Sequence, residues 1–381
     1  MFKTLRSASI LILILLVSTL AAESMEPKFS GQIRYRFEAG DKDFVSATGF
    51  NSASLLRSRL NLKFAPTAGV TAVLQVQDSR NFGEELSTLG DGSADNLDLH
   101  QAYFVLNPSG VENLSLKVGR FEAVYGPQRL IGAVGWHNIG RSFDGIVATV
   151  KTGPANLDLF TMKDGLVDVS GIYANLKLVE SMKTQAFYIA DNRRGTAGTY
   201  LAGKAANFFY EAEFAYQLGE KTDQVSYAAM LGALNVGMKV GSMKFMAGMD
   251  YLSGDDTTTT DVDEMFNTLY ATNHKYYGSM DYFLNLPVHT QNLGLMDIHF
   301  KAVLPAFMGI TPKLAYHMFT SPQANAAGDN DFGSEVDISL ARKYNKSMSW
   351  VAGYSMFMPG ALKATDGDNG QWAYLMTIVN F

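Results

Sequence analysis

Long segments of this sequence alternate polar and apolar residues with a period of two, and this pattern constrains the fold more than any other feature. In residues 32–38 and 56–64, apolar side chains occupy almost every second position, and in 372–381 one face with Trp372, Tyr374, Met376, Ile378 and Asn380 opposes a mostly apolar second face. Successive side chains of a β-strand point to opposite faces, so each segment is predicted to be a strand with two different environments. Helical periodicity is absent over any long window of the chain after residue 25.

The connections between these segments alternate between short turns and longer polar loops. Pro and Gly form turns for known steric reasons, and short turns are predicted at residues 65–69, 107–110, 152–154, 180–181, 205–206, 240–242, 305–309 and 345–346. Stretches rich in Gly, Asp and Asn lie between them at 40–51, 83–95, 123–139, 192–197, 254–292, 321–331 and 359–369, with shorter ones near 164–170 and 219–223. This alternation predicts about eighteen antiparallel strands, with both chain ends on one side.

A soluble fold does not suit such strands. Their length, about 10–13 residues, exceeds that of a sandwich strand and matches a tilted crossing of a membrane. The polar faces carry too much charge for a dry core, and a sheet in lipid must close because its edges would otherwise leave backbone groups unpaired. The predicted fold class is therefore all-β: a transmembrane antiparallel up-and-down β-barrel of about eighteen strands, with short periplasmic turns and longer extracellular loops.

The two ends of the chain indicate export to the outer membrane. Lys3 and Arg6 precede an apolar run at residues 10–17 and then small residues, which is typical of a secretory signal peptide. The expected organisation is a signal peptide at 1–22 and one barrel domain at 23–381. The chain ends in Phe381, and a terminal aromatic residue is typical of outer-membrane barrels. We expect this residue to be an assembly signal read by the barrel assembly machinery, and the lipid bilayer to be the other partner.

Several function classes find no support in the sequence. The chain has no Cys, no catalytic motif such as G-x-S-x-G or H-E-x-x-H, and histidines that are scattered without metal-ligand spacing. Acidic pairs in the stretch 254–292 are expected to be solvated loop residues and not a Ca²⁺ site. The net charge of −6 excludes a nucleic-acid partner recruited by bulk positive charge. We expect no enzyme activity, no cofactor and no bound metal.

The arginines gather in the N-terminal half of the chain, although the protein is acidic overall. The ten between residues 34 and 194 are Arg34, Arg36, Arg57, Arg59, Arg80, Arg120, Arg129, Arg141, Arg193 and Arg194. Guanidinium groups match carboxylates and phosphates, so an unpaired row of them would suit an anionic solute. The alternative is that these charges pair with Glu38, Asp78, Glu122 and Asp144 and stiffen the wall. Both arrangements are compatible with the sequence.

An ordered set of short motifs resembles the alginate export family. The motifs are LRSRL at 56–60, QVQDSR at 75–80, QAY at 101–103, VGRF at 118–121, YGPQRLIG at 125–132, RSFDG at 141–145, SGD at 253–255, FNTLYATNHKYYGSMD at 266–281 and GSEVDI at 333–338. The resemblance implies an outer-membrane barrel with an arginine-rich lumen, of the kind that exports the polyanion alginate. It also implies that Arg57, Arg59, Arg80, Arg120, Arg129, Arg141 and Asp144 stand at family-type positions.

The predicted function is an outer-membrane channel that passes hydrophilic, anionic solutes or polysaccharide by diffusion. The alternative is a general or small-anion porin without a polysaccharide role; a barrel hydrolase and a non-conducting adhesive barrel are further alternatives. The candidate residues lining the solute pathway are Arg34, Arg36, Arg57, Arg59, Lys63, Arg80, Arg120, Arg129, Arg141 and Asp144.

Overall fold

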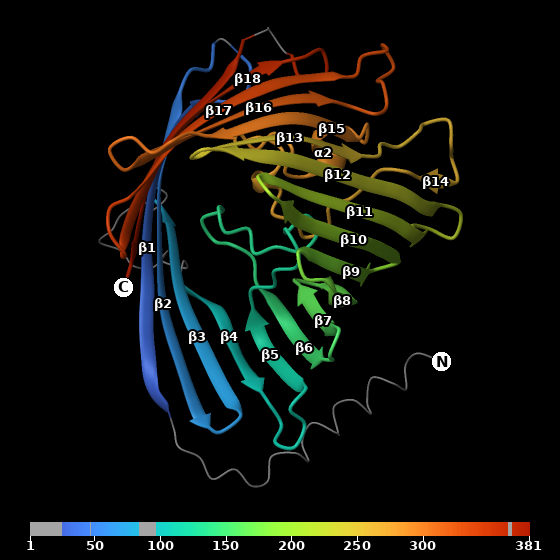
Figure 1. Cartoon of the computed structure of the whole chain (residues 1–381). Helices are drawn as coiled ribbons and strands as arrows, with labels where there is room; N and C mark the ends of the chain where they lie inside the picture. The colour runs from blue at the N-terminus through green and yellow to red at the C-terminus, as the bar shows by residue number, and fades with distance from the viewer. Residues whose placement is uncertain (1–24, 46, 84–96, 365–367) are drawn as a thin grey trace.

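The strands form one sheet that closes on itself (Figure 1). The computed structural model describes residues 25–45, 47–83, 97–364 and 368–381, so the predicted signal peptide lies outside the described residues. The first strand, β1 (Met25–Asp41), pairs with the last, β19 (Gly370–Asn380), and this pairing completes an 18-stranded antiparallel barrel. The strand number and fold class predicted from the sequence are confirmed.

The remaining wall strands follow one another in chain order. They are β2 (Asn51–Thr67), β3 (Val70–Asn81), β4 (Leu97–Leu106), β5 (Leu114–Phe121), β6 (Phe143–Lys151), β7 (Ala155–Asp164), β8 (Val167–Val179), β9 (Met182–Asp191), β10 (Arg194–Ala205), β11 (Phe208–Glu220), β12 (Ser226–Val240), β13 (Met243–Leu252), β15 (Leu295–Val303), β16 (Ile310–Thr320), β17 (Asp331–Lys343) and β18 (Met348–Pro359). A two-residue strand, β14 (Val262–Asp263), pairs in parallel with the start of β12.

Short connections gather at one end of the barrel, here called the short-turn end. Residues 68–69, 180–181, 206–207 and 241–242 are examples of its two-residue turns. The opposite end, here called the long-loop end, departs from the sequence prediction in two places. The expected loops at 164–170 and 192–197 are two-residue turns, because the polar residues around them continue the strands above the apolar band and do not leave the sheet.

The two faces of the sheet have different chemistry. In the register of β2 and β3, Leu60 lies opposite Val76, and both side chains are exposed on the outside of the barrel. The next pair along, Arg59 and Gln77, points into the lumen. Apolar side chains therefore face lipid and polar ones face the interior, as the closed barrel requires.

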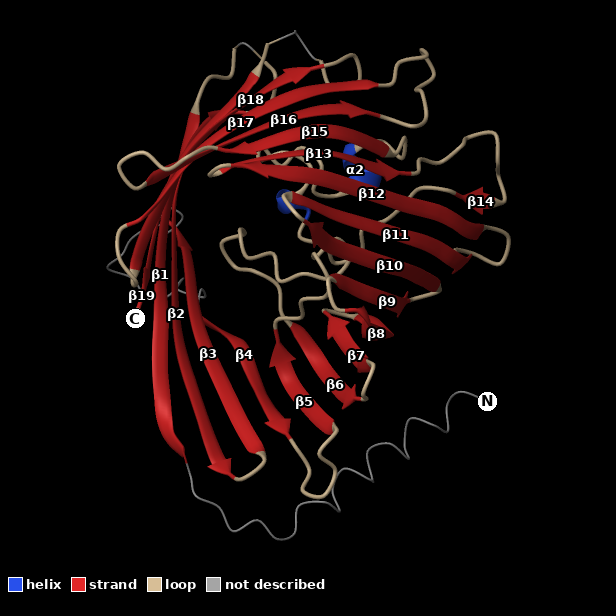
Figure 2. Ribbon diagram, viewed as in Figure 1, coloured by secondary structure: helices blue, strands red, loops and turns tan. Residues whose placement is uncertain are grey.

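Two connections fold into the lumen instead of extending outward. We call residues 122–142 the first inner loop and residues 253–294 the second inner loop. Figure 2 shows the first loop and the part of the second that carries α2 inside the ring of strands, whereas the stretch around β14 lies beside the start of β12 at the long-loop end. The second loop holds a short 3-10 helix (Asn273–Lys275) and α2 (Leu286–His289). In the part of the chain that the structure describes, no helix is long and apolar enough to cross a membrane. The stretch 254–292, predicted to be an extracellular loop, mostly lines the interior.

An aromatic core explains why these loops fold inward. Ile131 of the first loop and Tyr270 of the second form an isolated bridge, and the Gly132 nitrogen donates to the Tyr270 carbonyl at 2.9 Å. The buried cluster around this bridge includes Phe121, Phe143, Phe266, Tyr277, Phe283, Leu286, Phe319 and Phe357. Each buried side chain of this size stabilises the folded state by roughly 1.5–3 kcal/mol. The loops therefore form a packed plug in the long-loop half of the barrel.

Candidate functional site

Three arginines of the barrel wall hold the first inner loop in place. Arg34 donates to the carbonyls of Gly135 (2.7 Å) and His137 (2.9 Å), and Arg36 donates to the Trp136 carbonyl at 2.6 Å. Arg57 donates to the Gly135 and His137 carbonyls at 3.3 Å. The side chains are buried, with Arg34 only 3% exposed. They lie in the lumen, as the strand alternation indicates, and each donates to at least one loop carbonyl, while Arg57 Nε is buried without a hydrogen-bond partner among the described residues.

Arg59 is held in the same way by a denser network. Its guanidinium donates to Gln77 Oε1 (2.6 Å) and to the Ile139 carbonyl (3.1 Å), and forms an ion pair with Glu122 (3.0 Å). His100 lies 2.9 Å from the same carboxylate oxygen of Glu122. A solute would have to displace these partners to reach the guanidinium.

The pKa of His137 in the first inner loop responds to the neighbouring arginines of the barrel wall. Burial and the positive charges of Arg36 and Arg34 lower the pKa of His137 in the loop below its usual value of 6.5. A neutral imidazole avoids repulsion from the wall. The neighbouring Trp136 carries the Arg36 guanidinium 4.1 Å from its ring centre and stacks on His274 of the second loop at 4.3 Å.

Two of the predicted lumen arginines belong to the first inner loop itself. Arg129 is buried and forms a two-pronged ion pair with Asp250 of β13, with Nη1–Oδ2 at 2.7 Å and Nη2–Oδ1 at 2.9 Å. Arg141 lies 3.5 Å from Asp164 and donates to the Ala271 carbonyl. Both side chains join the plug to its surroundings.

Three other predicted lumen residues lie on the outer face, and this corrects the sequence analysis. Arg80 lies opposite Leu56 in the sheet, on the face away from Arg57. Arg120 lies opposite Asp144, on the face of β5 away from the buried Phe121. Their residue type favoured the lumen, but near the rim a charge on the outer face is tolerated because the strand leaves the hydrocarbon there.

The acidic partners that the alternative interpretation named are all bonded to arginines. The ion pairs are Arg36–Glu38 (2.5 Å), Arg80–Asp78 (2.8 Å), Arg59–Glu122 (3.0 Å) and Arg120–Asp144 (2.7 Å). These contacts are structural ones within the wall and between the wall and the plug. The arginines are therefore not an open row of anion ligands.

A different set of cations is open to the lumen, at the short-turn end. Strand register and alternation turn these lysines inward: Lys28, Lys63, Lys117, Lys151, Lys177, Lys183, Lys204, Lys239, Lys244, Lys301, Lys313 and Lys343. We call this set the lysine ring. Among the described residues, none of its members lies within ion-pair distance of a carboxylate.

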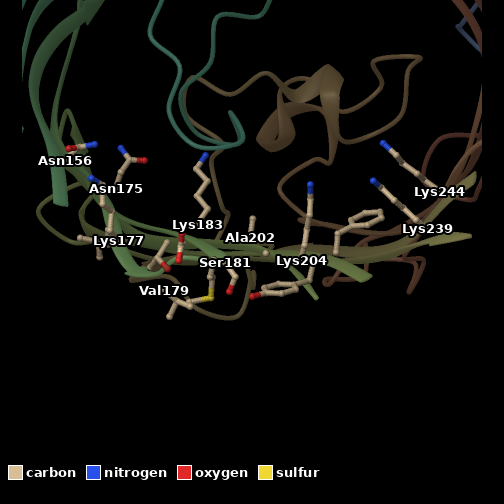
Figure 3. Close-up of a pocket in the computed structure, with 17 residues that line it drawn as sticks. Asn156, Asn175, Lys177, Val179, Ser181, Lys183, Ala202, Lys204, Lys239 and Lys244 are labelled. Carbon is tan, nitrogen blue, oxygen red and sulfur yellow. The ribbon is translucent and has the colours of Figure 1, made fainter. Parts of the chain in front are cut away.

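Part of the lysine ring lines a cavity of about 920 Å³. Figure 3 shows Lys183, Lys204, Lys239 and Lys244 extending from the wall into a shared space, with the inner loops beyond them. Of this ring, only Lys63 was predicted from the sequence to line the lumen. The missing signal was present in the sequence, since these lysines occur close to the predicted short turns.

Comparison with known proteins agrees with the barrel fold. The sequence model described as "Alginate export" matches residues 26–164 and 174–373, which is most of the chain. The chain belongs to the alginate export family. Family and fold are those of outer-membrane channels, and the protein is located in the outer membrane, as predicted from the sequence.

Solved structures of Pseudomonas aeruginosa barrels share this family member's fold. OpdO matches with a TM-score of 0.68 and 12% identity over 93% of this chain and 97% of its own. OccD3 (OpdP) matches with a TM-score of 0.66 and 10% identity over 96% of this chain and 95% of its own. The outer membrane protein OpdK matches with a TM-score of 0.65 and 10% identity over 93% of this chain and 98% of its own. A search of curated protein sequences gave no significant match.

Proposed function

We propose that this family member is an anion-selective diffusion channel for small hydrophilic solutes that carry carboxylates. The lysine ring is the observation that carries the proposal. Lysine ammonium groups without acidic partners raise the local concentration of anions in a confined aqueous space. The arginines, by contrast, are bonded to loop carbonyls and carboxylates.

The plug favours small solutes, because the two inner loops occupy the long-loop half of the lumen. A structural neighbour, OpdK, has been crystallised with vanillate, a small aromatic carboxylate. A polyanionic saccharide is the second candidate, and membership of the alginate export family favours it. Passage of such a polymer would require the inner loops to move.

Ion selectivity tests the proposal directly. We expect changing Lys183, Lys204, Lys239 and Lys244 together to Gln to move the zero-current potential of a planar bilayer in a KCl gradient toward cation preference. The shift should shrink at high salt, since the Debye length falls from about 8 Å at physiological salt to about 3 Å at 1 M.

Two comparisons make the result interpretable. Lys163 pairs with Asp168 on the outer face, so Lys163→Gln should leave selectivity unchanged. Changing Arg57 and Arg59 to Gln should increase gating noise more than it alters selectivity, because these side chains hold the plug. An unchanged zero-current potential in a well-folded quadruple variant at low salt would overturn the anion-channel proposal. Block by an oligomeric uronate, but not by a neutral oligosaccharide of equal length, would favour the second candidate.

A further inference from the structure

A carboxylate and two imidazoles meet on the lumen face of β15 and β16. Asp297 and His299 are two residues apart on β15, and His317 lies opposite His299 in the sheet. His317 Nδ1 lies 2.8 Å from Asp297 Oδ2, and His299 Nδ1 lies 3.2 Å from the same oxygen. All three side chains are buried, and their ligand atoms lie within 4.8 Å of one another.

The hydrogen bonds around His299 determine which of its nitrogens carries a proton. The Asn235 amide nitrogen donates to Glu211 Oε1 at 3.1 Å, which directs the amide oxygen of Asn235 toward His299. That oxygen lies 2.7 Å from His299 Nε2, so Nε2 is the donor. In a neutral ring, Nδ1 then carries the lone pair, and it has no hydrogen-bond partner among the described residues.

This lone pair faces a carboxylate oxygen, which is unfavourable unless a cation lies between them. An added proton on Nδ1 would supply one, and a metal ion would supply a stronger one. Imidazole nitrogens with a carboxylate oxygen suit divalent first-row metals such as Zn²⁺ and Co²⁺. Tetrahedral Zn²⁺ holds such atoms about 3.4 Å apart, given its bond lengths of about 2.0–2.2 Å. The observed separations from Asp297 need only small side-chain rotations to meet that geometry.

Cavities reach both histidines of the cluster, and the one beside His299 is also lined by Arg129, Lys275 and Lys301. His299 lines a cavity of about 190 Å³ and His317 lines one of about 350 Å³. Asn235 accepts a hydrogen bond from His299 Nε2, and a contact of this kind fixes the ring orientation of a metal-bound histidine. Lys301, two residues from His299 on the same strand, opposes a cation, and Glu335 lies opposite His317 on β17.

We propose that Asp297, His299 and His317 form a site for one divalent transition-metal ion in the channel wall. Three protein ligands leave one coordination position free for water or for a carboxylate solute. Binding would displace the proton that His317 Nδ1 shares with Asp297. No metal was expected from the sequence, because His317 is 18 residues from His299 and 20 from Asp297 along the chain and meets them only across the sheet.

The test uses the purified full-length barrel in detergent and Co²⁺ alone as the probe. We expect one Co²⁺ per barrel with the visible absorption of a four-coordinate site, displaced by Zn²⁺. The changes Asp297→Asn, His299→Gln and His317→Gln should each abolish this absorption. Asn235→Ala removes the hydrogen bond to His299 Nε2 and should weaken Co²⁺ binding by about 10–100-fold.

A matched histidine provides the control. His100 is also buried in the lumen and bonded to one carboxylate, Glu122, but it has no second histidine beside it among the described residues. His100→Gln should leave Co²⁺ binding unchanged, and compact migration before heating shows that each variant has folded. Absence of Co²⁺ binding by the unaltered barrel, or binding that persists in both His299→Gln and His317→Gln, would overturn the proposal.

Discussion

The ion pair between Arg129 and Asp250 should anchor the plug to the wall, and its loss should be costly. Arg129 is 2% exposed and Asp250 0%. Two hydrogen bonds of 2.7 and 2.9 Å join them, while the Arg129 guanidinium lies 3.8 Å from the ring centre of Tyr276 and 3.6 Å from Glu213. The pair therefore connects the first inner loop, the second inner loop and strand β13 at one point.

The size of the effect follows from the burial of both charges. Two unit charges about 4 Å apart attract by about 4 kcal/mol at an effective dielectric constant of 20. Removing one partner of a buried pair typically costs about 3–5 kcal/mol, since the other charge stays buried without its partner. We therefore expect Asp250→Asn to destabilise the folded state by about 3–5 kcal/mol. In a background that already carries Arg129→Met, the same change should be neutral or stabilising, because it then removes an unpaired carboxylate.

The measurement is urea unfolding of the barrel in lipid vesicles for both single variants and the double variant. Trp136 of the first inner loop reports release of the plug by its fluorescence, and compact migration in a gel reports the barrel. The exposed pair Lys163–Asp168, at 2.6 Å, is the control, and Lys163→Met should cost at most about 1 kcal/mol. An equal cost of Asp250→Asn in both backgrounds would refute the argument that this pair holds the plug.

Two further predictions concern assembly and topology. Deleting Phe381 should lower the amount of folded protein in the outer membrane by more than the loss of one lipid contact explains. The Phe381 backbone bonds to Gly31 where the barrel closes, and its ring covers Gly31 on the outer face. Normal levels and normal heat-modifiability would contradict a role for the terminal residue. Single cysteines at Ala326 and Gly153 of this cysteine-free chain should label from outside intact cells only at Ala326, and the reverse pattern would contradict the predicted orientation, with the short turns facing the periplasm.

The fold was predictable because membrane barrels impose a local rule on every strand. Each strand must alternate between lipid and water, so strands such as β2 reveal themselves without knowledge of their partners. The rule weakens at the rim, where both faces are wet. There the sequence analysis placed loops at 164–170 and 192–197, although the sheet continues through most of these residues.

The plug could not be predicted by that rule. The inner loops are stabilised by contacts between residues far apart in sequence, such as the bond from the Tyr270 nitrogen to the Leu130 carbonyl at 2.8 Å. Their polar composition resembles that of an ordinary surface loop. The inward faces of Arg34 and Arg36 were predictable from alternation, but their bonding to loop carbonyls was not. Arg80 was misplaced for the opposite reason, because residue type was weighed above strand parity.

The different placement of arginines and lysines in the lumen has a physical basis. A guanidinium presents five donors in a rigid plane and is weakly hydrated, so it can bind several carbonyls or a carboxylate at fixed geometry in a buried place. An ammonium is a compact, strongly hydrated point charge on a flexible stem, which suits transient contact with a passing anion. Arg36, which donates to a plug carbonyl, and Lys204, which lines the cavity, show the two placements in one lumen. In the proposed anion channel, separating these residues along the axis would keep the arginines beside the plug and leave the lysines of the short-turn end to the solute.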